Sequence, residues 1–509
     1  MSMDCISTQI PYKQTGYFSN LMNDYLDQSE KLKPFFEYSN DWKGFEAALK
    51  NRQNYITDRN LLVQHLQQQY SSLSISESTK RNIELLAKPT TFTVTTAHQP
   101  FYKIFHAIRI AEEAKQRFSR FNFVPVYYMG NEDADLDELG HFFLQGEKFN
   151  WETAQTGAVG AMKVDDSLIK LIYRAAGQIN VLPHGERLMK EIQNIFTIGK
   201  TIQQATFELV NHLFSDWGLV VMIADSKLMK QQVIPVFAKE LFGEGASGYV
   251  LNTTERLEQE GYKMQAHPRE INLFYLSEGI RNRIIKEGDT FLVNQTDLKF
   301  TEEEMKVLLE THPENFSPNV ILRGIYQETI LPNIAFVGGG GETAYWLQLR
   351  ALFTAYGVHF PVLVARNSFL IVSGKQSQLL KNMQLEPAQL FIGSEKLLQY
   401  LVKREAGEVV SLQSKIEQAI IFYEQIKQQA ASVDKTLLAH VEALKTQTLN
   451  KLQELEKKLM RAEKRKFSDQ QRQLSGLFVS LFPGGGLQER VENFMTFYGQ
   501  QGGDWLNTI

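Results

Sequence analysis

Two β-rich runs separated by a helical segment constrain the fold of this 509-residue chain more than any other feature. Residues 91–97 (TFTVTTA) and 123–129 (FVPVYYM) are rich in the β-branched and aromatic side chains that favour strands. Between them, apolar residues recur three and four positions apart from residue 102 to residue 118, which is typical of an amphipathic helix. A strand, a helix and a strand in this order predict a βαβ unit, whose crossover favours a parallel sheet covered by helices.

The alternation of strand and helix patterns continues along the chain. Further strands are predicted at residues 219–224, 290–293, 333–337 and 361–365, with helical patterns between them. Residues 17–86 are mainly helical, and residues 164–206 form an inserted region. We therefore expect an α/β fold with a Rossmann-like, doubly wound parallel sheet and inserted connecting segments.

The residue composition changes after Pro387: no proline follows until Pro483, and no glycine lies between Gly407 and Gly476. Apolar residues keep a near-heptad spacing over this stretch, which predicts a long α-helical coiled-coil domain. This spacing places the apolar residues in one stripe, or seam, along the helix. The seam must pack on another helix, either folded back from the same chain or supplied by a second subunit. We expect a homodimer.

These patterns divide the chain into three parts. Residues 1–375 are expected to form the Rossmann-like core with its helical N-terminal segment and insertions. Residues 376–475 would form the coiled-coil arm, and residues 476–509 a C-terminal segment that docks back on the core.

Composition excludes several classes of function. The 54 basic and 58 acidic residues give a net charge of −4, so no global positive field would attract nucleic acid. The single cysteine, Cys5, excludes an intramolecular disulfide and a multi-cysteine metal site. No signal-peptide pattern and no long apolar run are present, so we expect a cytoplasmic protein without a membrane partner.

Three turns follow predicted strands, where a doubly wound fold places its active site. The first contains His98, whose imidazole can carry a proton, and Gln99, whose side-chain amide can form hydrogen bonds with a substrate. A lone histidine is more often a hydrogen-bonded structural residue, and that alternative stays open.

The second turn, residues 130–137 (GNEDADLD), is acidic. Glu132, Asp133 and Asp135 could contact a substrate ammonium or a cation, because several carboxylates at one sheet edge repel one another unless a positive charge is present. The alternative is a solvated turn that caps the next helix. The metal, if any, is unknown from the sequence.

The third turn is Gly338, Gly339, Gly340 and Gly341, followed by Glu342. Glycines between a strand and a helix let an anion approach the helix N-terminus, so this turn is a candidate anion or nucleotide site. It only half matches the dinucleotide fingerprint. Arg323 and Arg366 flank it in sequence and could hold carboxylates, although structural salt bridges are the common role of an arginine.

Several motifs together resemble the BshC family, the cysteine-adding enzymes of bacillithiol biosynthesis. They are TTAHQP, FVPVYYMGNEDADLDEL, HPREINLFYLSEGIRNRI, FSPNVILRGIYQETILPNIAFVGGGGETAYW, PVLVARNSF and LFPGGGLQERVENFMTFY. The resemblance implies a Rossmann-like core, a coiled-coil domain, a dimer and a ligase that forms an amide bond between cysteine and glucosaminyl-malate. It also places the site at His98, Gln99, Glu132, Asp133, Asp135, Gly338 to Gly341, Glu342, Tyr345, Trp346 and Arg366.

The implied reaction needs an activated carboxylate, because amide formation is uphill in water. ATP, with magnesium, is the simplest activator. The acidic turn would hold the cysteine ammonium or the magnesium ion, and the glycine turn would receive an anion. Arg366 or Arg323 would hold malate carboxylates, and His98 would move the proton. We assign His98, Glu132, Asp133 and Glu342 to catalysis, and Gln99, Asp135, Arg323, Tyr345, Trp346 and Arg366 to substrate binding.

One segment departs from the family pattern. Family members usually carry a short glycine-containing stretch between the histidine turn and the helix, whereas here Pro100 and Phe101 lead directly into Tyr102 and Lys103. That stretch would lie over the active end of the first strand. Its absence gives some weight to the alternative function, a non-catalytic dimeric coiled-coil protein whose core binds a nucleotide or sugar ligand, beside the ligase that the resemblance implies.

Overall fold

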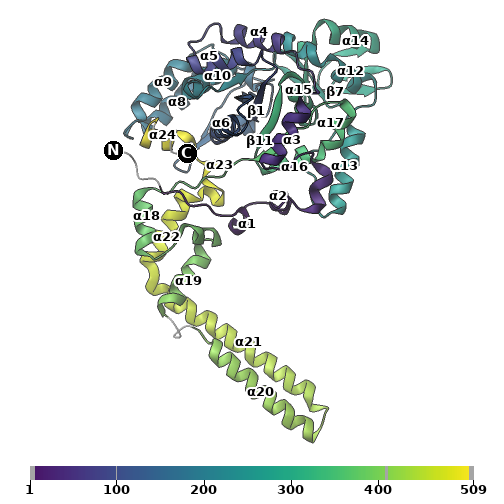
Figure 1. Cartoon of the computed structure of the whole chain (residues 1–509). Coiled ribbons are helices and arrows are strands. Elements are labelled where there is room, and N and C mark those ends of the chain that lie inside the picture. Colours follow the sequence, from purple (N-terminus) through teal and green to yellow (C-terminus); the bar gives the residue numbers. More distant parts are fainter. Residues whose placement is uncertain (1–5, 99, 407–410, 504–509) are drawn as a thin grey trace. The chain divides into compact units, whose positions relative to one another are not determined.

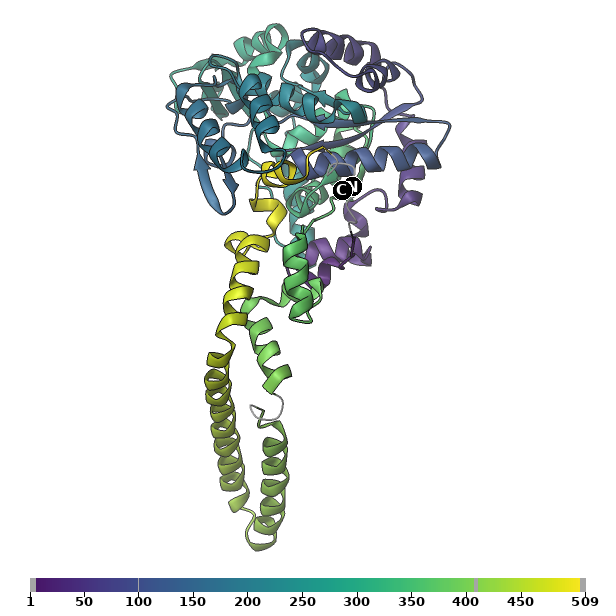
Figure 2. The ribbon, with the colours of Figure 1, turned by 90° about the vertical axis from the view of Figure 1, so that its left-hand side faces the viewer.

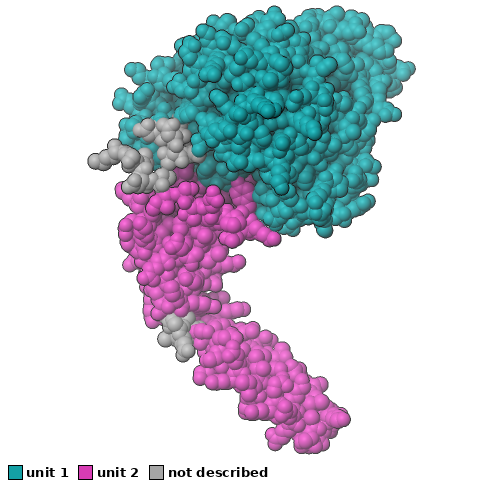
Figure 3. All heavy atoms as spheres, viewed as in Figure 1, with its two compact units in different colours: residues 1–5, 18–369, 492–509 teal, residues 6–17, 370–491 magenta. Residues whose placement is uncertain are grey.

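A computed structural model describes residues 6–98, 100–406 and 411–503 of the chain, in two compact units (Figure 3). The first unit contains residues 18–369 and the segment that begins at residue 492. The second contains residues 6–17 and 370–491. Among the described residues, no helix is both long and apolar enough to cross a membrane.

A five-stranded parallel sheet forms the centre of the first unit, in the order β12-β11-β1-β2-β5. The strands are β1 (Thr91–Ala97), β2 (Asn122–Tyr128), β5 (Val220–Met222), β11 (Asn333–Gly338) and β12 (Val362–Ala365). The predicted parallel, Rossmann-like sheet is therefore confirmed. The chain runs outward from β1 through β2 to β5 and then returns to the other side of β1 at β11. The topological switch point consequently lies between β1 and β11.

Helix α6 (Pro100–Arg117) connects β1 to β2 and, with α3 (Trp42–Arg52), packs on the sheet (Figure 1). Its apolar side chains recur at helical spacing, so one face is buried against the strands. A common hydrophobic core joins the two helices to the sheet through Phe45, Ala107, Ala111, Val94 and Ile334, all almost fully buried. Burial of this kind contributes about 25 cal/mol per Å² of apolar surface and fixes the helices on the strands.

A second, antiparallel sheet is inserted between β5 and β11, in the order β10-β6-β7-β8-β9. Its strands are β6 (Leu273–Ser277), β7 (Ile280–Glu287), β8 (Thr290–Val293), β9 (Lys299–Thr301) and β10 (Phe316–Pro318). Residues 290–293 thus form a strand as predicted, but outside the parallel sheet. The two-residue turn Gly288-Asp289 joins β7 to β8 as a hairpin, and a short hairpin can only give antiparallel pairing.

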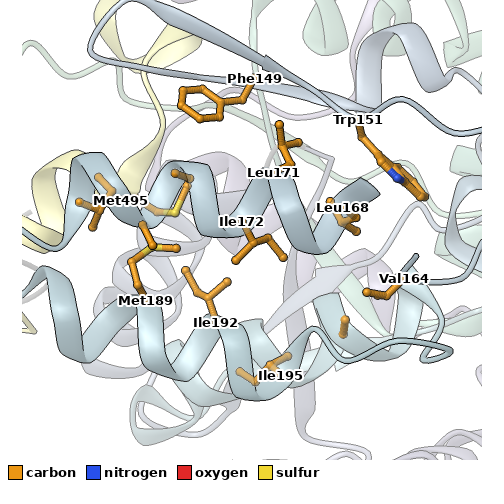
Figure 4. Packing of buried hydrophobic residues seen from close by; sticks show 14 of the residues in the cluster. Phe149, Trp151, Val164, Leu168, Leu171, Ile172, Met189, Ile192, Ile195 and Met495 are labelled. Atoms are coloured by element: carbon orange, nitrogen blue, oxygen red, sulfur yellow. The ribbon is translucent and has the colours of Figure 1, made fainter. Parts of the chain in front are cut away.

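A helical insertion follows β2. It contains the hairpin β3 (His141–Leu144) and β4 (Glu147–Asn150), then α8 (Asp166–Ile179), α9 (Gly185–Ile195) and α10 (Ile202–Phe214). Figure 4 shows the core of this insertion, where Ile172 of α8 faces Met189 and Ile192 of α9, and Leu171 lies on the side of Phe149 of β4. Met495 of α24 (Phe494–Gln501) joins the same core, so this helix is packed into the first unit.

The second unit is helical, with α18 (Gly374–Asn382), α19 (Ser394–Ala406), α20 (Gln413–Val433), α21 (Leu437–Lys464) and α22 (Ser468–Leu481). The proline-free stretch is not one helix, because it breaks between α20 and α21, where Asp434 has extended backbone angles. Helices α20 and α21 lie side by side as a hairpin (Figures 1 and 2). The apolar seam therefore packs on a helix folded back from the same chain, which was one of the two partners that the sequence allowed.

Candidate active site

The carboxyl ends of the five parallel strands bring the predicted turns to one edge of the sheet. His98 follows β1, the acidic turn follows β2, the glycine turn follows β11 and Arg366 follows β12. In a parallel sheet these ends share one edge, so the three turns predicted from the sequence lie together. Gln99 lies outside the described residues.

His98 stands at the centre of this edge, in a left-handed backbone conformation with φ of 49°. Few non-glycine residues adopt such angles, and they occur often at functional sites. Its imidazole lies on Gly130, since a Cβ atom added to Gly130 would come within 2.6 Å of the His98 Cε1 atom. None of the described residues forms a hydrogen bond with the imidazole nitrogens.

Positive charges surround the imidazole. Arg323 has the largest effect, and together with burial and with Lys103 and Arg281 it holds the pKa of His98 well below its usual value. The ring is therefore neutral at physiological pH. A neutral imidazole with no hydrogen bond to the described residues presents an unprotonated nitrogen to a substrate, and the surrounding cations make this nitrogen a weaker base than a free imidazole.

Glu132 is buried in the acidic turn and forms an ion pair with Lys230 of α11 (Lys227–Lys230). Lys230 also contacts Asp225 at 2.7 Å, and its side chain is fully buried. Burial raises the pKa of Glu132 to about 7, against the opposing effect of Lys230. The Glu132 carboxyl group therefore titrates close to physiological pH.

Asp133 and Asp135 have different surroundings from Glu132. The Asp133 side chain is 39% exposed, and its Oδ1 atom lies 3.8 Å from Nη1 of Arg281 on β7. Asp135 caps the short helix α7 (Leu136–Leu139) by accepting the Glu138 N–H at 3.0 Å. Capping was the structural alternative considered for this turn, and it accounts for Asp135.

The acidic turn is not built to hold a metal by itself. Glu132 is engaged by Lys230 and Asp135 by a helix N-terminus, so their carboxylates do not converge on one point. In the part of the chain that the model describes, no group of three or more His, Cys, Asp or Glu side chains is placed to bind a metal ion.

The glycine turn joins β11 to α16 (Gly340–Gln348) at the switch point. The Gly339 N–H donates to Oε2 of Glu342 at 2.9 Å, so the protein's own carboxylate already caps the first donor of the turn. Among the residues that the structure describes, the N–H groups of Gly340 and Gly341 have no backbone partner, so they are available to a ligand. The Arg366 N–H donates to the Gly338 carbonyl at 2.8 Å, which fixes the arginine beside the turn.

Arg323 lies on α15 (Val320–Ile330) and donates through Nη2 to the hydroxyl of Tyr345 on α16. Its buried Nη1 atom has no hydrogen-bond partner among the described residues. A buried guanidinium without a full set of partners is costly unless an anion completes it. The ring of Trp346 packs between Phe336 and Phe353 in the hydrophobic core.

The sequence interpretation missed three charged residues at this edge: Lys103, Lys230 and Arg281. Lys103 could have been noticed, since it is a lysine among the apolar residues that begin α6. Lys230 and Arg281 carried none, because their partners Glu132 and Asp133 are distant in sequence. Only the folded chain brings these charges together.

Residues 1–367 match the family model for the bacillithiol biosynthesis BshC N-terminal Rossmann-like domain, and residues 369–509 match the model for the BshC C-terminal coiled-coil domain. The chain belongs to the BshC family. BshC relatives include a Flavobacterium johnsoniae protein, 37% identical over 99% of this chain and 96% of its own length. A Cytophaga hutchinsonii protein is 36% identical over 96% of this chain and 93% of its own length. Both BshC relatives are described as candidate cysteine ligases.

Proposed function

We propose that this protein is a cysteine ligase of bacillithiol biosynthesis, which forms an amide bond between the cysteine carboxylate and the amine of glucosaminyl-malate. Family membership supports the reaction class. The observation that carries the proposal is the neutral His98 imidazole, which has no hydrogen bond to any described residue and is surrounded by positive charge.

The reaction needs a base, because an amine attacks an acyl carbon only after it has lost its ammonium proton. A neutral His98 ring first accepts that proton, and the free amine then forms the nitrogen–carbon bond as the bond from the acyl carbon to its leaving group breaks. The second proton that the nitrogen releases passes to the departing group. Arg323, whose buried Nη1 atom has no partner among the described residues, then stabilises the negative charge that develops on the acyl oxygen and leaving group.

The acidic turn and the cations suit the two substrates in different ways. Glu132 and Asp133 supply negative charge on the turn that begins at Gly130 and can receive the cysteine ammonium. Arg323 and Arg366 supply positive charge for the carboxylates of the malyl group. The carboxylates of the acidic turn and the two arginines would together orient the amine of one substrate toward the carboxyl carbon of the other.

Activation of the carboxylate requires a co-substrate, and ATP supplies a phosphoryl or adenylyl group that leaves when the amide forms. The free N–H groups of Gly340 and Gly341, with Arg366 beside them, fit an anionic phosphate. This fit supports ATP as the activator.

Incubation of the purified full-length protein with cysteine, glucosaminyl-malate and ATP tests the proposal. We expect mass spectrometry to detect the cysteinyl product, and its formation to stop when any one of the three is omitted. An intact, ligand-binding protein that makes no product would instead support the non-catalytic alternative.

We also propose that the protein forms a homodimer in solution. The exposed apolar residues Ile421 and Phe422 on α20 remain uncovered by the hairpin. Sedimentation of the full chain at micromolar concentration should give twice the monomer mass of 58.4 kDa. A monomeric mass would contradict this proposal without affecting the assigned reaction.

A further inference from the structure

Lys103 lies inside the candidate site and connects three of its parts. Its side chain is 5% exposed, and its Nζ atom donates to the Ala97 carbonyl at 2.9 Å, at the end of β1. The same Nζ forms an ion pair with Oε2 of Glu342. That oxygen also accepts the Gly339 N–H, so Lys103 fixes the carboxylate to the glycine turn across the switch point.

The position of Glu342 creates an electrostatic problem for an anionic substrate. The N-terminus of α16 would attract an anion through its free N–H groups and the helix dipole. A carboxylate at the same place repels that anion, and the repulsion is strong because the group is largely buried. Lys103 cancels the negative charge of Glu342 at contact distance.

Two further cations lie near the same turn. The Nε atom of Arg366 would be 3.3 Å from a Cβ atom added to Gly339. Arg323 has a buried Nη1 without a partner among the described residues, and the charge of Glu342 acts on it. With Lys103 paired to Glu342, the positive charge of Arg323 is available to a ligand.

We propose that Lys103 is a positioning residue, which holds Glu342 on Gly339 and neutralises it so that the glycine turn can bind an anionic group of a substrate. This inference rests on the proposed function, which supplies two candidate anions: the phosphates of ATP and the carboxylates of glucosaminyl-malate. Without Lys103, the uncompensated Glu342 would repel either anion.

Four full-length proteins test the inference: the wild type, Lys103→Gln, Glu342→Gln and the double variant. Calorimetric titration with ATP and, separately, with glucosaminyl-malate gives two affinities for each. We expect Lys103→Gln to weaken binding of one ligand by about tenfold or more, since like charges at an interface are strongly unfavourable. The double variant removes both charges, so it should bind that ligand more tightly than Lys103→Gln, to within about threefold of the wild-type affinity. The ligand that responds is the one whose anion occupies the turn.

Thermal unfolding of the same four proteins separates this role from a purely structural one. If Lys103 only stabilised the fold, folded Lys103→Gln protein would bind both ligands with wild-type affinity, and the inference would be wrong. A folded double variant that binds as weakly as Lys103→Gln, or a wild type that binds neither ligand at millimolar concentration, would also overturn it.

The product assay keeps this inference distinct from the proposed function. Product formation by a wild type that lacks the predicted affinity pattern would overturn the role of Lys103 and leave the ligase function standing. The predicted affinity pattern in a protein that forms no product would overturn the ligase function and leave the role of Lys103 standing.

Discussion

The imidazole of His98 lies directly on the backbone of Gly130, the residue that begins the acidic turn after β2. The two residues belong to neighbouring strand ends, so the contact joins the first two predicted turns. Any side chain at position 130 would occupy the place of the imidazole, because an added Cβ atom would lie 2.6 Å from the ring. The position of His98 therefore depends on this glycine.

Replacing Gly130 by alanine should displace the imidazole and lower kcat by about tenfold or more, since small misplacements of a catalytic group are costly. Gly177→Ala is a matched control, because it adds a methyl group to an exposed position of α8 with no atom within 4 Å. Steady-state rates of product formation should fall for the first variant only. Equal rates for Gly130→Ala and the wild type would show that the contact does not position His98.

Alanine substitutions of Asp133 and Glu342 should both stop product formation but differ in stability. Asp133 is partly exposed and lies 3.8 Å from Arg281, so its loss should change the free energy of unfolding by only about 0.5 kcal/mol. Loss of Glu342 leaves Lys103 buried without its partner, which costs about 3–5 kcal/mol. Urea unfolding measures both values. Full ligase activity in both variants would refute the assignment of these two residues.

The ionisation of Glu132 should shape the pH dependence of the reaction. Its pKa is raised to about 7 by burial, and only the ionised form can hold the cysteine ammonium. We expect kcat/KM to rise with pH through about 7, and the Glu132→Gln variant to lose this rise together with most of its activity. If the Glu132→Gln variant kept the pH profile of the wild type, Glu132 would not be a residue of the active site.

Glu328 provides a pH-dependent test of the fold away from the active edge. This residue of α15 is 2% exposed, and burial raises its pKa from 4.5 to about 7. Because the folded protein binds this proton more tightly than the unfolded chain, its contribution to stability is lost as pH rises from about 4.5 through 7. Glu328→Gln should therefore be more stable than the wild type at pH 8 by about 1–3 kcal/mol, with a flatter pH dependence. Urea unfolding at pH 5.5 and pH 8 measures the free energy of unfolding of both proteins. An equal pH dependence for Glu328→Gln and the wild type would contradict a raised pKa of Glu328.

The α20 and α21 hairpin predicts which residues of the arm can be cross-linked within one chain. Lys427 contacts Glu442 at 2.8 Å, and Lys445 contacts Glu424 at 2.6 Å. Zero-length carbodiimide cross-linking of a mixture of ¹⁵N-labelled and unlabelled protein should join these pairs within a chain. Cross-linked peptides of mixed label would contradict the hairpin and indicate helices exchanged between subunits.

The sequence predicted the parallel sheet and the three turns because their signals are local. The β-branched run at residues 91–97 corresponds to β1, and the four glycines mark the end of β11 and the start of α16. By contrast, the ion pair between Lys103 and Glu342 joins residues 239 positions apart. No local pattern specifies such a partner.

Tyr345 and Trp346 show a second limit of sequence interpretation. Both come from the same motif, but consecutive helical residues point about 100° apart. Tyr345 therefore meets Arg323 at the active edge, while Trp346 turns into the aromatic core beside Phe336. The motif alone could not show that these two neighbouring residues lie in different environments.

The rate of product formation by a His98→Asn variant tests the central claim most directly, with His212→Asn on the exposed face of α10 as the control. If the neutral His98 imidazole accepts the ammonium proton, the first variant should lose about a hundredfold or more in kcat while the control keeps the wild-type rate. Both variants should remain folded by circular dichroism. A folded His98→Asn protein that forms the cysteinyl product as fast as the wild type would contradict the account.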